Sequence, residues 1–148
     1  MLVIDRERRE FEDGFAYAEE ESEALAPQLI WRAADFARWG KLPRPAGLVV
    51  EGAVSPEELR DLVGRVDLIV VQFLKFSDGR GFTLAHQLRQ KLGYGGDLRA
   101  AGWVIPDQFA ALMKVGFSSV EVSERHPVGQ WGGKAEGGAR QLLARLMS

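Results

Sequence analysis

The chain has 148 residues, of which 46% are hydrophobic and 27% are charged, as is typical of one soluble globular domain. A net charge of -2 argues against nucleic acid or anionic lipid as a partner. The absence of cysteine excludes disulfides, thiolate catalysis and Cys-ligated metal centres. The N-terminal segment is too charged for a signal peptide, and no apolar run approaches the ~18 residues of a membrane span. We therefore expect a cytoplasmic protein that contacts no membrane and no nucleic acid.

Residues 1–46 predict an N-terminal arm followed by a connector. Residues 2–4 form a short apolar strand, and the aromatic residues on either side of Asp13-Gly14 favour a β-hairpin or a strand–turn pair. Residues 35–39 are expected to form a helical turn that brings large rings to the core. The connector covers residues 40–45, which contain two prolines and a glycine.

Residues 47–122 predict the core of the domain. Apolar runs at 47–50, 68–71, 98–101 and 119–122 alternate with helical patterns at 55–66, 82–92 and 106–116. Ser55, Pro56 and Glu58 form the start of a capped helix. This order predicts an α/β fold with an open, mainly parallel four-stranded sheet made of half-barrel-like βα repeats, because a full eight-fold barrel needs about 250 residues. Residues 123–148 add a loop and a C-terminal helix from 135 to 147, which completes a single domain over residues 1–148.

The turn after the second core strand is the first candidate site. Lys75, Asp78, Gly79 and Arg80 lie where the chain leaves this strand and enters a helix. Free backbone N–H groups, positive charge and a helix N-terminus together favour an anion. The alternative is a plain strand-to-helix turn in which Asp78 pairs with Arg80.

The third core strand and the helix after it supply the remaining candidates. Arg99 is costly to bury unless it is paired, and Asp78 or Asp107 is the expected partner. Gln108 follows Asp107 and has no evident packing role. Since ligands bind beyond the carboxyl ends of parallel strands, we expect these side chains to gather at one edge of the sheet.

The other polar and aromatic residues give weaker signals. His86 and His126 lack the spacing of metal ligands, and no catalytic or cofactor motif is present, so we expect neither a metal nor a cofactor. A site that joins His126 to Glu121 and Glu124 is a further alternative. Trp131, with the apolar stripe of the last helix, is the expected contact surface.

Several of these residues, in this order and spacing, resemble a bacterial family known as domain of unknown function 934. The shared pattern comprises Phe76, Asp78-Gly79-Arg80-Gly81-Phe82, Leu88-Arg89, Leu98-Arg99-Ala100, Gly102, Asp107-Gln108 and Gly116-Phe117. The chain departs from the family pattern at Leu74, Val115 and Ser118, where the family usually has Pro, Cys and Asp. The resemblance implies a cytoplasmic protein encoded with sulfite reductase and other enzymes of sulfur assimilation, sometimes labelled an oxidoreductase.

Three functions follow as alternatives. The first is an accessory protein of reductive sulfur (sulfite) assimilation that acts by contact with a redox partner such as sulfite reductase. The second is an enzyme or sensor that binds a small oxyanion at Lys75, Asp78, Gly79, Arg80, Arg99, Asp107 and Gln108. The third is a structural or homodimerisation module in which the central motif only joins two loops.

Overall fold

The computed structural model describes residues 1–19, 24–75 and 77–132 and shows an α/β fold. The strands are β1 (Leu2–Asp5), β2 (Glu10–Glu12), β3 (Ala16–Tyr17), β4 (Leu29–Arg32), β5 (Gly47–Glu51), β6 (Leu68–Phe73), β7 (Asp97–Gly102) and β8 (Ser119–Glu121). The α-helices are α1 (Ala33–Trp39), α2 (Pro56–Leu59), α3 (Arg80–Gln90) and α4 (Phe109–Val115). Three short 3-10 helices are η1 (Val63–Arg65), η2 (Pro106–Gln108) and η3 (Val128–Trp131). No helix among the described residues is long and apolar enough to span a membrane.

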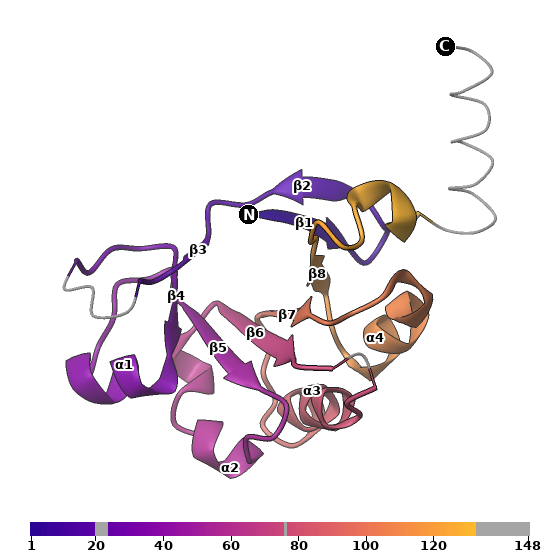
Figure 1. Ribbon diagram of the computed structural model, residues 1–148. Helices are drawn as coiled ribbons and strands as arrows, with labels where there is room; N and C mark the ends of the chain where they lie inside the picture. Colours follow the sequence, from indigo (N-terminus) through magenta and orange to yellow (C-terminus); the bar gives the residue numbers. More distant parts are fainter. Residues whose placement is uncertain (20–23, 76, 133–148) are drawn as a thin grey trace, which may run out of the picture.

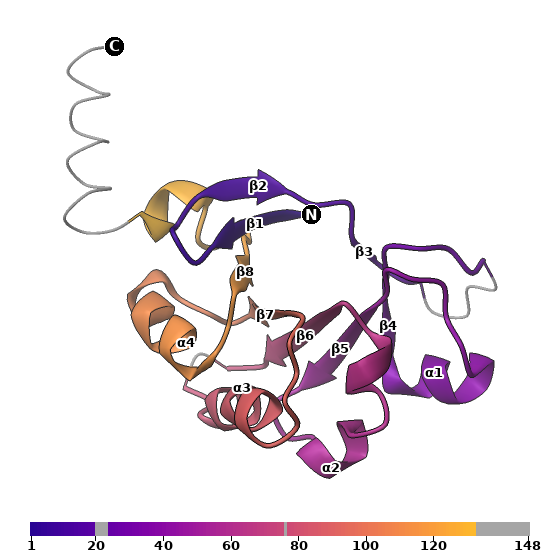
Figure 2. The ribbon, with the colours of Figure 1, turned by 180° about the vertical axis from the view of Figure 1, so that it is seen from behind.

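All eight strands belong to one mixed sheet, in the order β2-β1-β8-β7-β6-β5-β4-β3. Neighbours from β3 to β8 run parallel, whereas β1 pairs antiparallel with both β2 and β8. The sheet curls like half a barrel, and the four α-helices lie on its outer side (Figure 1 and Figure 2). Only residues 13–15 separate β2 from β3, so a short segment joins the two edges of the curled sheet.

The predicted parallel core is confirmed, but the prediction of a four-stranded sheet was wrong. The N-terminal hairpin belongs to the sheet through the pairing of β1 with β8, and β4 and β3 extend its other side. The hairpin turns at residues 6–9, where Arg8 has a φ of 64° and the Asp5 carboxylate accepts the Glu7 and Arg9 N–H groups. Phe11 and Tyr17, expected around one turn, therefore lie on strands at opposite edges of the sheet.

The helices predicted within the described residues are present with one change. The capping box that joins Ser55 and Glu58 starts α2 as expected, but the helix ends at Leu59 and a separate 3-10 turn follows at η1. Residues 33–39 form α1, which contains the predicted helical turn. The predicted C-terminal helix at 135–147 lies outside the described residues.

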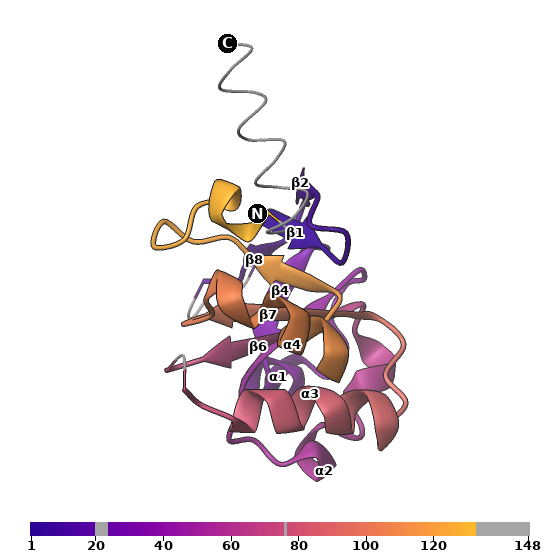
Figure 3. The same cartoon turned by 90° about the vertical axis from the view of Figure 1, so that its right-hand side faces the viewer.

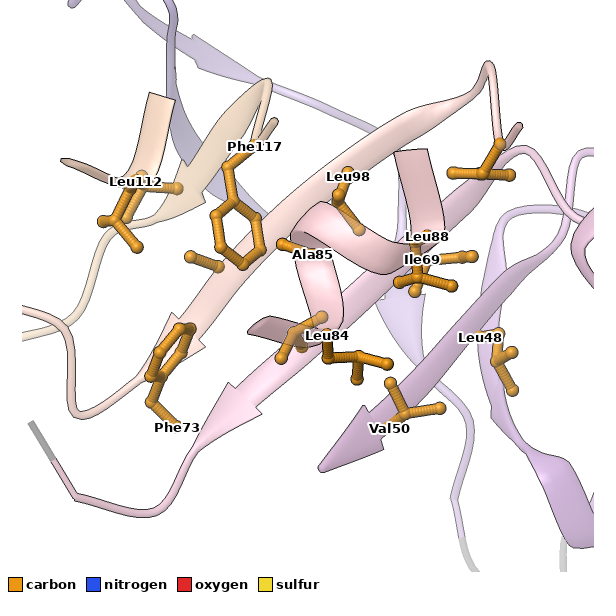
Figure 4. Close-up of a cluster of buried hydrophobic side chains, with 14 of the residues drawn as sticks. Leu48, Val50, Ile69, Phe73, Leu84, Ala85, Leu88, Leu98, Leu112 and Phe117 are labelled. Carbon is orange, nitrogen blue, oxygen red and sulfur yellow. The ribbon is translucent and has the colours of Figure 1, made fainter. Parts of the chain in front are cut away.

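Two apolar layers cover the two faces of the sheet. On the outer face, Ile69, Val71 and Phe73 of β6 pack with Leu84 and the neighbouring helix residues (Figure 4). On the inner face, a smaller cluster contains Ile30, Leu68, Val70 and Ala101. Because both faces of β6 are covered, its sequence is continuously apolar until Gln72, where a polar side chain enters the inner face.

Candidate functional site

The carboxyl ends of β6, β7 and β8 point to the same side of the molecule (Figure 3). In open parallel sheets, ligands bind beyond these ends. We use the term carboxyl rim for the following residues at or shortly after the carboxyl ends of β5–β8: Glu51, Gln72, Leu74, Lys75, Asp78, Gly79, Arg80, Gly102, Trp103, Glu121 and Arg125.

The loop between β6 and α3 contains a closed ion pair. Asp78 accepts hydrogen bonds from the Arg80 backbone N–H at 3.1 Å, from its Nε at 2.9 Å and from its Nη2 at 3.0 Å. The bond to the Arg80 side chain lowers the pKa of Asp78, and the charge of nearby Lys75 contributes to the same shift. The structure thus brings together the predicted Lys75, Asp78, Gly79 and Arg80, and the expected pairing of Asp78 with Arg80 is confirmed.

Two glycines allow the first turn of α3 to pack closely against its neighbours. A Cβ at Gly52, after β5, would lie 2.7 Å from the Gly81 nitrogen, and a Cβ at Gly81 would lie 2.4 Å from the Phe73 ring. This contact places Arg80 beside a shallow hollow that is also lined by Gly52 and Gly79. The hydrogen bond to Asp78 is the main cause that raises the pKa of Arg80, and the charge of nearby Glu51 adds to this shift.

Arg99 does not join the loop, and the prediction that Asp78 or Asp107 pairs with it was wrong. Its side chain is 1% exposed and donates to Asp97 Oδ2 at 3.0 Å and to Ser119 Oγ at 2.9 Å. It also forms an ion pair with Asp13, from the segment that joins β2 to β3. The reason is the alternation of a strand: Leu98 and Ala100 face the helices, so Arg99 faces the inside of the curl.

The other two predicted residues lie in the turn after β7. Asp107 is exposed in η2 and forms no ion pair with Arg80 or Arg99 within the described part of the chain. Gln108, which was expected to have no packing role, accepts the Ile105 N–H at 3.3 Å and closes the start of η2. The structure therefore splits the seven predicted residues into the Lys75–Arg80 loop, the η2 turn and the buried Arg99.

A hydrogen-bonded chain on the inner face was missed by the sequence-based prediction. Tyr17 donates its hydroxyl to Glu121 at 2.8 Å and accepts a bond from the Gln72 amide at 3.3 Å. Burial, followed by the negative charge of Glu121, raises the pKa of Tyr17, so the phenol stays protonated and donates. Each of Gln72 and Glu121 is next to an apolar residue that faces the helices, so each must face the inside of the sheet. This alternation is the sequence signal by which polar groups of the inner face could have been found.

Exposed apolar side chains follow two neighbouring strands of the rim. Leu74 is 53% exposed and Trp103 is 46% exposed, and they follow β6 and β7, which pair as far as Phe73 and Gly102. Gly102 has a φ of 83°, which glycine tolerates, and the chain turns outward there. Arg125 donates to the Gly102 carbonyl at 3.3 Å and stacks 3.8 Å from the Trp103 ring centroid.

The contact surface predicted around Trp131 was wrong for the tryptophan itself. Trp131 is 1% exposed, packs edge-on against Phe109 and donates its Nε1 to the His126 carbonyl at 3.0 Å. His126 contacts Gln130 instead of Glu121 or Glu124, and His86 is exposed on α3. The apolar stripe of the last helix lies outside the described residues. No group of three or more metal-binding side chains occurs in the part of the chain that the structure describes.

Arg89, which belongs to the resemblance pattern, has a structural role. Its guanidinium donates to the carbonyls of Gly116 at 2.9 Å, Tyr94 at 2.9 Å and Gly96 at 2.7 Å. Burial lowers the pKa of Arg89, and these carbonyls compensate for part of its lost hydration. Gly116 is required beside it, because a Cβ there would lie 2.6 Å from the Arg89 Cγ.

The pattern residues thus divide into two groups. Gly81, Arg89, Arg99 and Gly116 hold the fold together, whereas the Asp78–Arg80 loop and Asp107 lie on the surface at the carboxyl ends of the strands. Comparison with known proteins found no match among curated proteins and none among solved structures. A family described as bacterial proteins of unknown function, DUF934, matches residues 47–136, which include every strand of the rim. The chain therefore belongs to the DUF934 family.

Proposed function

We propose that this protein is an accessory protein of reductive sulfur assimilation that binds a redox partner enzyme through its carboxyl rim. The observation that supports a docking role is the exposed pair of apolar side chains, Leu74 and Trp103, at the exits of adjacent strands. Large exposed aromatic residues are the usual anchors of protein interfaces. The choice of a sulfite-reducing partner rests on the resemblance of the sequence to the DUF934 family.

The geometry around Trp103 favours a preformed anchor. The guanidinium of Arg125 lies over the ring and is itself bonded to the Gly102 carbonyl, so the indole is held in one orientation before any partner arrives. A side chain that is already ordered before binding loses less conformational entropy when the complex forms. Lys75 beside Leu74 and Arg125 beside Trp103 place positive charge next to the apolar pair.

Replacing Trp103 with serine should weaken binding to purified sulfite reductase at least tenfold, because the variant loses the central apolar anchor. Co-elution on a sizing column and a titration by interferometry measure the effect. Phe11→Ser is the matched control, since Phe11 is also exposed, at 39%, but lies on the edge strand β2. An absent complex, or equal loss of binding in both variants, contradicts the proposal.

A second function is supported by the charge of the same loop. Arg80 lines the hollow beside Gly52 and Gly79 at the first turn of α3, and Lys75 is near enough that its charge acts on Asp78, an arrangement that suits a small oxyanion. The buried Arg99 is neutralised by Asp13 and Asp97, so this site would rest on Lys75 and on Arg80, which is itself paired with Asp78, in place of the three cations expected from the sequence.

Calorimetry with sulfite, sulfate and phosphate tests the second function directly. If it is correct, one of these anions should bind and Arg80→Ala should weaken that binding about tenfold, while Trp103→Ser should leave it unchanged. Heats that stay at the dilution baseline for all three anions, or affinity that survives in Arg80→Ala, would rule out the loop as an oxyanion site.

A further inference from the structure

A second hollow lies at the opposite end of the parallel strands, away from the carboxyl rim. It measures about 320 Å³ and is lined by Phe36 of α1, by Lys41, Leu42 and Arg44 of the connector, and by Arg65 of η1. Arg44 and Arg65 come shortly before β5 and β6, which places the hollow at the amino ends of these strands. Its volume falls within the range of about 300–1,000 Å³ that is usual for small-molecule sites.

The inner wall of this hollow is apolar and well packed. Phe36 and Leu42 are 3% and 4% exposed and belong to the main core cluster. Their side chains are held by the surrounding core, so the wall does not depend on a ligand for its shape. An apolar group placed against this wall gains free energy from burial, which a bare inorganic anion cannot.

The charge around the hollow has a single sign. Lys41, Arg44 and Arg65 line it, and no carboxylate does. Arg44 is already engaged, because its Nη2 and Nε donate to Asp67 at 2.9 Å and 3.2 Å. Lys41 and Arg65 have no carboxylate partner among the described residues, and the Arg65 guanidinium lies 5.4 Å from the Phe36 ring centroid.

From this combination we propose that the hollow binds a small organic anion with an apolar body, such as a medium-chain carboxylate or an aromatic acid. The apolar body lies against Phe36 and Leu42, and the carboxylate faces Lys41 and Arg65. A cationic amphiphile could place its apolar body against the same wall, but Lys41 and Arg65 would repel its positive head group. This site is separate from the rim and does not depend on the proposed docking function.

Calorimetric titration of the full chain with octanoate tests the proposal, with acetate and octyltrimethylammonium as comparison ligands. We expect octanoate to bind, acetate to give no measurable binding because it lacks the apolar body, and octyltrimethylammonium to bind at least tenfold more weakly than octanoate. Raising the salt concentration should weaken octanoate binding, since the cations are near the surface.

Variants locate the binding. Lys41→Gln with Arg65→Gln should weaken octanoate binding at least tenfold, whereas Lys114→Gln, which removes an exposed charge from α4, should not change it. Arg65→Glu should reverse the preference between octanoate and octyltrimethylammonium. The proposal is overturned if octanoate does not bind, if acetate binds equally well, if the cationic amphiphile binds as tightly as octanoate, or if the double variant retains full affinity.

Discussion

Replacing Arg99 with alanine should lower the free energy of unfolding by about 3–5 kcal/mol, the usual result of breaking a buried ion pair. The guanidinium is 1% exposed and is held by Asp13, Asp97 and Ser119. Removing it leaves Asp97 without its cation and Asp13 with only the N-terminal amine at 3.7 Å, and an unpaired charge is costly in a partly buried site. Urea unfolding followed by tryptophan fluorescence measures the loss.

Arg80→Ala is the matched control for this prediction. Arg80 also forms a bridge with a carboxylate, but its side chain is 63% exposed, so solvent screens the pair and its removal should leave stability nearly unchanged. Asp97→Asn provides a second test should Arg99→Ala fail to fold. A loss below about 1 kcal/mol in Arg99→Ala would show that the network is not a main source of stability.

The Arg99 network also explains how the sheet keeps its curl. Asp13 lies between β2 and β3, the two edge strands, whereas Arg99 lies on β7 in the middle of the sheet. Tyr17 of β3 reaches Glu121 of β8 across the same inner face. These contacts tie residues 1–19 to strands in the DUF934 match, which starts only at residue 47, so the N-terminal segment completes the inside of the sheet.

The central part of the fold was predictable because its signals are local. Continuous apolar runs marked β5 to β8, and the spacing of Ser55, Pro56 and Glu58 marked the start of α2. The strand β4 and the pairing of β3 with it were not predicted, for the opposite reason. β3 has two residues, too few to show a pattern, and nothing local to β4 indicates that it pairs with β3 and β5.

At the site too, a contact between residues close in sequence was predicted correctly, whereas a contact between distant residues was not. Asp78 and Arg80 are two residues apart, so their pairing could be predicted from the sequence. The partners of Arg99 could not be predicted fully, because Asp13 is 86 residues away and only the curl of the sheet brings it close. Asp97 was predictable in principle, since residues two apart on a strand share a face and Arg99 cannot face the same side as Leu98.

The second large effect concerns Gly81, whose replacement by alanine should destabilise the fold by about 1–3 kcal/mol through overpacking. The added Cβ would lie 2.4 Å from the Phe73 ring. This ring is 1% exposed and packs against Phe82 and against Phe117, of which Figure 4 shows the second, so it has little room to move. Denaturant unfolding measures the loss.

Gly79 is the matched control, two residues earlier in the same turn. A Cβ at Gly79 meets no atom within 4 Å, and its φ of -65° suits alanine, so Gly79→Ala should be neutral or should stabilise by up to about 1 kcal/mol. Adding Phe73→Leu to Gly81→Ala should recover part of the loss, because a smaller side chain makes space for the new methyl group. If Gly81→Ala were as stable as Gly79→Ala, the second glycine of the Asp78-Gly79-Arg80-Gly81 turn would not be needed for packing. The glycine would then have to be explained by what binds at the carboxyl rim, since the fold alone would tolerate a side chain at that position.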